Sequence, residues 1–176
     1  MEVFEFAFLT WNREEERLEV LVELPNAKIV EEAPVLLTPW HLFDFDLASL
    51  TVMTPYLMSP QRGFSFGMAL LWADETESDP ATWMGDVTAR YDGTEQRLGH
   101  DTLRYELTGS ALEGSRSTGP YGALWLDDDD GHIVEAAFPM PNHPGYTDFL
   151  LRLERVSDGG SAEWDELLNA HYQDCE

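Results

Sequence analysis

The stretch that decides the fold is residues 119–156, GPYGALWLDDDDGHIVEAAFPMPNHPGYTDFLLRLERV. It contains three strand-length apolar runs, and two strong turn signals separate them. The first signal is an acidic run closed by a glycine, and the second is the proline-rich corner at residues 139–144. In the last run, Phe149 and Leu151 alternate with charged residues such as Arg152. This pattern predicts an antiparallel β-meander.

Alternating apolar residues predict more strands upstream of the meander. Residues 4–8 and 18–24 fit a hairpin, and residues 64–73 fit an apolar strand in which Gly67 marks a bulge or a close backbone approach. Prolines beside residues 28–38 indicate an edge.

A second hairpin is predicted over residues 86–91 and 103–107, with Asp92 and Gly93 as its turn. In this interpretation residues 99–101 interrupt the second arm as a bulge or a small loop. Residues 74–80 are acidic and rich in turn-forming residues, which predicts a loop.

Two helices are predicted. Asp46 can cap a short buried helix that Pro55 ends or kinks. Ser161 can cap a last helix, whose apolar stripe beginning at Trp164 should dock on the sheet. We therefore expect one domain over residues 1–176, of α+β class and mostly antiparallel β. Its strongly curved sheet or open half-barrel would pack on one or two helices, with lipocalin-like closure as the alternative.

The charge balance excludes several partners. The chain has 34 acidic and 10 basic residues and a formal net charge of −24, so its surface field repels phosphate backbones and anionic membranes. No window of eighteen apolar residues occurs, which argues against membrane insertion. Cys175 is the single cysteine, so no intramolecular disulfide forms. The N-terminus alternates apolar and acidic residues, which predicts a cytoplasmic protein if Met1 is the native start and an exported one otherwise.

The acidic run at residues 127–130 has two interpretations. As an EF-hand loop it would need an oxygen ligand at Leu126 and a glutamate at Ala137, and both are absent. A hairpin turn needs only left-handed geometry, which aspartate and glycine tolerate. The turn is the favoured interpretation, and weak cation binding is the alternative.

Two histidines and an aspartate beside one of them are the candidates for acid–base chemistry. Carboxylate pairs are too numerous for one pair to be chosen. His132 alternates in register with Val134 and Ala136, which favours a hydrogen-bonded structural residue over a catalytic base, while His100 lies beside Asp101. We take His100, Asp101 and His132 as weak catalytic candidates. No histidine pair has zinc-ligand spacing and no glycine-rich loop precedes a helix, so the sequence predicts neither a metal site nor a cofactor.

Aromatic residues are abundant on the predicted strands. Most should fill the core, but so many strands with so few helices indicate a concave apolar cavity. The candidate residues for binding a hydrophobic ligand there are Phe6, Trp72, Tyr105, Trp125 and Val134.

One resemblance rests on strand order over residues 87–156. LRYELTG, a loop and GALWLDDDDGHIVEAAF, followed by a further strand, resemble the strand pattern of the lipoprotein-carrier superfamily, the LolA/LolB-like half-barrels, and of related bacterial proteins of unknown function. The resemblance implies an unclosed antiparallel barrel around helices, with a cavity that accepts acyl chains. It transfers no functional residue to this chain.

These observations lead to three functional hypotheses. The first is a non-enzymatic protein that binds a hydrophobic or lipid-like small molecule in the concave face of the sheet. The second is an enzyme for a small aromatic or apolar substrate in the same cavity. The third is a subunit that docks a protein partner through exposed apolar residues of the segment 40–58. The oligomeric state is left open.

Overall fold

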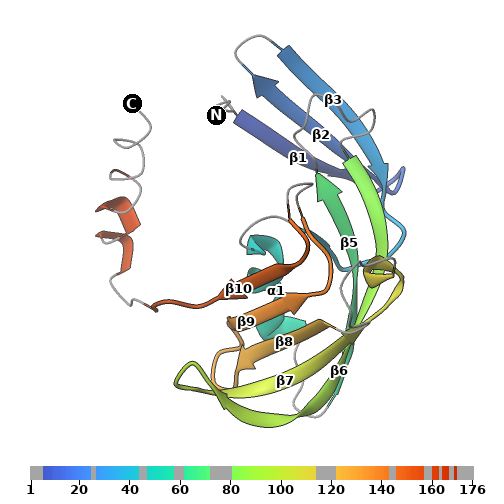
Figure 1. The fold of residues 1–176 in the computed structure, drawn as a ribbon. Helices are drawn as coiled ribbons and strands as arrows, with labels where there is room; N and C mark the ends of the chain where they lie inside the picture. The colour runs from blue at the N-terminus through green and yellow to red at the C-terminus, as the bar shows by residue number, and fades with distance from the viewer. Residues whose placement is uncertain are drawn as a thin grey trace.

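In a computed structural model, the described residues form two β-sheets, an α-helix labelled α1, a short 3-10 helix (Ser110–Leu112) and helical turns near the C-terminus (Figure 1). The described residues are 6–24, 27–43, 47–57, 62–71, 81–113, 122–142, 146–156, 160–162, 164–166 and 169. None of the helices among them has the length and apolar character needed to cross a bilayer.

The smaller sheet has the order β1-β2-β3 and is antiparallel. Its strands are β1 (Phe6–Asn12), β2 (Arg17–Leu24) and β3 (Ala27–Pro34). The Asn12 side chain accepts hydrogen bonds from the backbone N–H groups of Glu14 (3.2 Å) and Glu15 (3.3 Å), which stabilises the turn between β1 and β2. The predicted first hairpin is confirmed.

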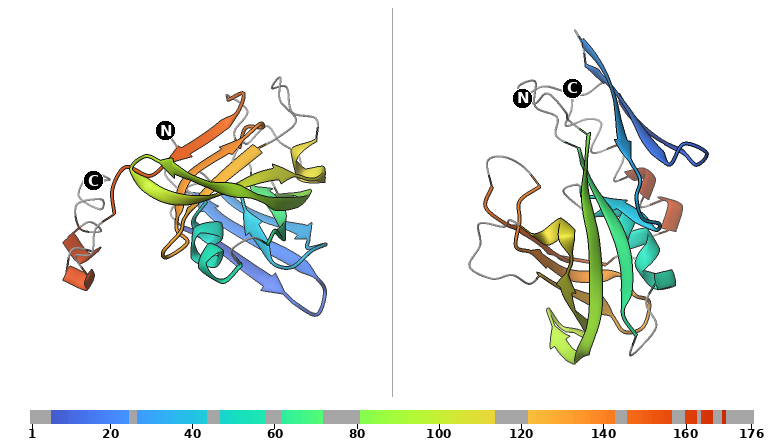
Figure 2. Two further views of the ribbon diagram at one scale, coloured as in Figure 1. Left: turned by 90° about the horizontal axis from the view of Figure 1, so that it is seen from below. Right: turned by 90° about the vertical axis from the view of Figure 1, so that its right-hand side faces the viewer.

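The larger sheet has the order β10-β9-β8-β7-β6-β5-β4, and only β4 pairs in parallel with its neighbour. Its strands are β4 (Trp40–Leu42), β5 (Phe64–Leu71), β6 (Ala81–Arg97), β7 (His100–Thr108), β8 (Gly122–Asp127), β9 (Ile133–Phe138) and β10 (Phe149–Arg152). It curls around α1 (Ala48–Leu57), as Figures 1 and 2 show. The described order is open at both ends, which confirms a half-barrel of α+β class rather than a closed lipocalin-like barrel.

The meander predicted from residues 119–156 is present as β8, β9 and β10. The acidic run makes the turn between β8 and β9. The Asp127 carbonyl accepts a hydrogen bond from Gly131 N–H (3.0 Å), and Gly131 has a φ of 77°, which glycine adopts without strain.

The hairpin of β6 and β7 corrects the predicted turn at Asp92 and Gly93. β6 continues through these residues with a register shift between Tyr91 and Gly93, so they form a bulge. The chain turns instead at Leu98 and Gly99, whose φ values of 51° and 89° fit a two-residue hairpin turn. A leucine seldom adopts positive φ, which is why the sequence pattern hid this turn. Residues 100 and 101 consequently belong to β7.

The main core lies on the concave side of the larger sheet. Leu47, which precedes α1, and Leu50, which lies within it, pack there with Phe43. The ring centroid of Phe43 lies 5.1 Å from that of Phe138 and 5.1 Å from that of Phe149. A second cluster joins the two sheets and consists of Leu18, Ala33, Val35 and Ala69, with Trp40 and Trp83 packed against it. Gly67 allows the close approach predicted for it, because an added Cβ would lie 2.1 Å from Trp83.

The helix predictions have different outcomes. α1 confirms the first helix, although Pro55 lies within it and it continues to Leu57. Its outer face exposes Val52 and Tyr56. Residues 160–169 contain helical turns, but every described residue of them is exposed, including Trp164 at 59%, so the predicted docking on the sheet is wrong for these residues (Figure 1). The cap proposed at Asp46 and the acidic loop 74–80 lie outside the described residues.

Candidate functional site

A groove of about 770 Å³ opens beside α1 and the β10 edge of the larger sheet. It is lined by Thr51, Ile133, Leu151, Arg152, Leu153, Glu154 and Arg155. Ile133 belongs to the main core and Leu151 packs against it, so the apolar floor of the groove is continuous with the core. The Leu153 N–H donates to the Val134 carbonyl (2.9 Å), which keeps the chain beside β9 beyond the end of β10.

Two of the lining residues are arginines in a chain that has only ten basic residues. Arg152 donates from Nε to Glu135 (3.2 Å), so its charge is already partly neutralised. Arg155 is exposed and forms no ion pair with another described residue. The groove therefore places an uncommitted positive charge beside an apolar floor.

Glu135 lies on the face of β9 opposite the main core and is 2% exposed. Arg97 reaches it with Nε (3.1 Å) and also with Nη2, and Arg152 reaches it from β10. Burial acts to raise the pKa of Glu135, but the hydrogen bonds and charges of the two arginines outweigh it and hold that pKa below its ordinary value. This ionised carboxylate links β6, β9 and β10. Its sequence signal was a single charge inside the apolar run of residues 133–138.

The structure does not bring the predicted ligand-binding residues together. Tyr105 is fully buried on the concave side, with its ring centroid 5.2 Å from that of Phe64, and burial raises the pKa of its hydroxyl. Trp125 lies on the opposite face, because it pairs with Arg104 while Tyr105 pairs with Leu124. The Arg97 guanidinium stacks 4.6 Å above the Trp125 ring.

Val134 is also fully buried. The side chain of Phe6 and all of Trp72 lie outside the described part of the structure. Of the five residues proposed to bind a ligand, those with described side chains are therefore packed rather than exposed to the groove.

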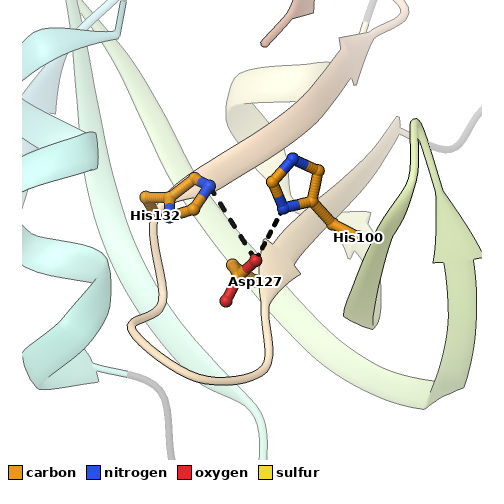
Figure 3. Close-up of side chains that lie close together, drawn as sticks. All are labelled: His100, Asp127 and His132. Atoms are coloured by element: carbon orange, nitrogen blue, oxygen red, sulfur yellow. Dashed lines mark hydrogen bonds and ion pairs between the residues drawn. The ribbon is translucent and has the colours of Figure 1, made fainter. Parts of the chain in front are cut away.

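The histidine cluster consists of His100, Asp127 and His132 (Figure 3). His100 begins β7, Asp127 ends β8 and His132 precedes β9, so the two neighbouring hairpins bring the residues together. Nδ1 of His100 donates to Oδ2 of Asp127 (2.9 Å), and Nε2 of His132 lies 3.9 Å from the same oxygen. The two imidazole centroids are 5.5 Å apart.

Asp127 and His132 make further contacts in the cluster. Burial acts to raise the pKa of Asp127, but hydrogen bonds from His100 and from the backbone of Asp129 and Asp130 outweigh it and lower that pKa. Nδ1 of His132 is hydrogen-bonded to the Asp130 carboxylate. Nε2 of His132 is buried and has no hydrogen-bond partner among the described residues.

Two of the three weak catalytic candidates, His100 and His132, are thus neighbours, but Asp127 and not Asp101 bridges them. The Asp101 side chain instead accepts a hydrogen bond from Gln96. From residue spacing we expected no metal ligands, and this stays a prediction. The cluster brings together residues that are distant in the sequence. Its members are separated by 27 and 5 positions, and the register of β7 against β8 aligns His100 with Asp127.

A further histidine lies on β4. His41 is 2% exposed and its ring centroid is 5.2 Å from that of Phe66. Burial lowers the pKa of His41 to about 4. Both ring nitrogens are buried without a hydrogen-bond partner among the described residues. It is a neutral structural side chain at physiological pH.

No family model, curated protein or solved structure matches this chain. The groove and the histidine cluster are therefore interpreted from their own geometry.

Proposed function

We propose that this protein binds an amphipathic small molecule, with an apolar tail and an anionic head group, in the groove beside α1 and β10. The observation that supports this most strongly is the combination of Arg155 with an apolar floor inside a strongly acidic chain. The proposed ligand is still hydrophobic, as the sequence predicted. We locate it in the groove beside α1 and β10, because side chains of the main core fill the concave face around Tyr105.

The size and lining of the groove suit such a ligand. Small-molecule sites usually enclose about 300–1,000 Å³ and combine apolar walls with a few polar groups. Here Ile133, Leu151 and Leu153 supply apolar surface, and Thr51 supplies a hydroxyl. A chain of about ten methylene groups, buried at about 0.8 kcal/mol each, would contribute about 8 kcal/mol, which is comparable to the cost of about 4–15 kcal/mol for its lost translational and rotational freedom.

The charge of the head group follows from the arginines. Arg152 is shared with Glu135, so Arg155 would be the main contact of a carboxylate or a similar anion. Glu154 lines the same groove and its charge would oppose a second anion, which favours a head group with one charge.

The experiment compares two amphiphiles of equal tail length and opposite charge. Dodecanoate and dodecyltrimethylammonium are titrated by calorimetry below their micelle concentrations. A chain of net charge −24 attracts cations over its whole surface, so non-specific adsorption favours the ammonium compound. The groove predicts the reverse preference, with one dodecanoate per chain. Stronger binding of the cation would refute the proposal.

The matched variants are Arg155→Gln in the groove and Arg13→Gln in the hairpin of β1 and β2. Both remove one exposed charge, so their effects on the net charge are equal. An exposed charge contact is worth about 1 kcal/mol, which corresponds to about fivefold in affinity. We expect this loss for Arg155→Gln and no change for Arg13→Gln. Equal losses would show that the net charge, and not the groove, determines binding.

A further inference from the structure

We propose that His100, Asp127 and His132 form a binding site for a divalent transition-metal ion of the zinc type. Two imidazoles and one carboxylate are ligands that Zn²⁺ prefers, whereas Ca²⁺ and Mg²⁺ prefer sites made of oxygen atoms alone. The site is separate from the proposed ligand groove, and neither proposal depends on the other.

The positions of the donor atoms are close to those that a metal ion requires. One ligand atom from each residue lies within 4.8 Å of the other two. Donors at about 2.0 Å from a tetrahedral ion are about 3.3 Å apart, so the longest separation has to shorten by about 1.5 Å. All three side chains are partly buried, and rotation of the two imidazoles would have to supply this change.

His132 provides the independent observation that points to a cation. Its Nδ1–H donates to Asp130, which leaves the lone pair on Nε2. Within the described part of the chain, that Nε2 is buried without a hydrogen-bond partner, and it lies 3.9 Å from the Asp127 carboxylate. This separation is too long for a hydrogen bond but close to the distance of about 3.3 Å between two donors on a tetrahedral ion. A carboxylate that holds the far nitrogen of a histidine is also the usual outer contact of a metal-bound imidazole.

The backbone around the cluster is well ordered by hydrogen bonds, so the site is preorganised. Asp127 N–H donates to the His132 carbonyl (2.9 Å), and Asp128 N–H donates to the Asp101 carbonyl (3.0 Å). These bonds connect the start of β7, the end of β8 and the residue before β9, which are the positions of the three ligands. Three protein ligands leave one coordination position open to water or to another small ligand.

The experiment measures Zn²⁺ binding to protein that has been treated with a chelator and then freed of it. We expect one Zn²⁺ per chain by calorimetry, in the presence of excess Mg²⁺. His132→Gln and His100→Gln should each weaken binding at least 100-fold. Asp130→Asn, which alters only the outer contact, should weaken it 10- to 100-fold.

The matched control is the double variant Asp128→Asn/Asp129→Asn. It removes two charges from the same turn but none of the three ligands, and both residues are exposed. Its affinity should stay within about threefold of the wild-type value. Binding that survives both histidine substitutions, or that the control abolishes equally, would overturn the site.

A second measurement needs no variant, so a folding defect cannot obscure it. The chain has two isoleucines, Ile133 next to the cluster and Ile29 on β3 in the other sheet. With both δ1 methyl groups labelled with ¹³C, one equivalent of paramagnetic Co²⁺ should shift or broaden the Ile133 signal and leave the Ile29 signal unchanged. An unchanged Ile133 signal, or equal effects on both signals, would overturn the proposal.

Discussion

The buried carboxylate of Glu135 allows a quantitative test of the structure. Arg97→Met keeps most of the aliphatic stem of residue 97 but removes its two hydrogen bonds to Glu135. Glu135, at 2% exposed, would then keep only Arg152, whose side chain is 56% exposed. Breaking a buried ion pair costs about 3–5 kcal/mol. Because the Arg97 side chain is itself 36% exposed, we expect the low end, about 3 kcal/mol.

Substitution of the other partner of this ion pair, Glu135, should destabilise the fold less. In Glu135→Gln the arginines lose their charged partner, but water can reach both of them, so we expect a loss of about 1–2 kcal/mol. The double variant Arg97→Met/Glu135→Leu leaves no buried charge. It should therefore be more stable than Arg97→Met alone.

The assay is urea unfolding at pH 7, followed by circular dichroism, with the free energy of unfolding extrapolated to water. The Arg97→Met penalty should also shrink between pH 7 and pH 5. Without Arg97, burial raises the pKa of Glu135 above its value in the unfolded chain, so the folded state gains stability as the carboxyl takes up a proton. Equal losses of stability for Arg97→Met and Glu135→Gln, or a double variant less stable than Arg97→Met, would refute the claim that removing Arg97 costs more than removing the charge of Glu135.

Three further predictions concern other parts of the fold. The pKa of His41 is about 4 in the folded protein and about 6.5 in the unfolded chain, so the unfolded chain takes up the proton first as the pH falls. Between pH 6.5 and pH 4 the free energy of unfolding of the wild type should therefore fall by about 3 kcal/mol relative to that of His41→Leu. Urea unfolding that gives the same pH dependence for both proteins would contradict this. Gly67→Ala should cost about 2–3 kcal/mol, because its Cβ would collide with Trp83; an unchanged melting temperature would show that the ring moves away freely. In α1, Leu50→Ala should cost about 2–5 kcal/mol and Tyr56→Ser less than about 0.5 kcal/mol, since the side chains are 1% and 81% exposed. Equal losses in chemical denaturation would contradict the packing of the Leu50 face of α1 on the core.

Local sequence patterns predicted the parts of the fold that depend on neighbouring residues. The meander of β8, β9 and β10 follows from alternation and from turn residues that lie within a few positions of each other. The hairpin of β6 and β7 was predicted with the wrong turn, because Asp92 and Gly93 suit a bulge as well as a turn. The actual turn places Leu98 at positive φ, which no propensity favours.

The candidate sites depended on contacts between distant segments and were less predictable. His100 and His132 were named individually, but their meeting at Asp127 requires the register of β7 against β8. Glu135 was not singled out, since its partner Arg97 lies 38 positions away. The exposed Trp164 shows the opposite case, in which an amphipathic pattern predicted docking that the described residues do not have.

The most direct test of the proposed function is a titration of dodecanoate followed by the methyl signals of the two isoleucines. Ile133 lines the groove, and Ile29 belongs to β3 in the smaller sheet. We predict that the Ile133 signal moves and saturates at one dodecanoate per chain while the Ile29 signal stays in place, and that Arg155→Gln needs about fivefold more ligand for the same shift. An Ile133 signal that does not move, or one that moves together with Ile29, would contradict ligand binding in the groove.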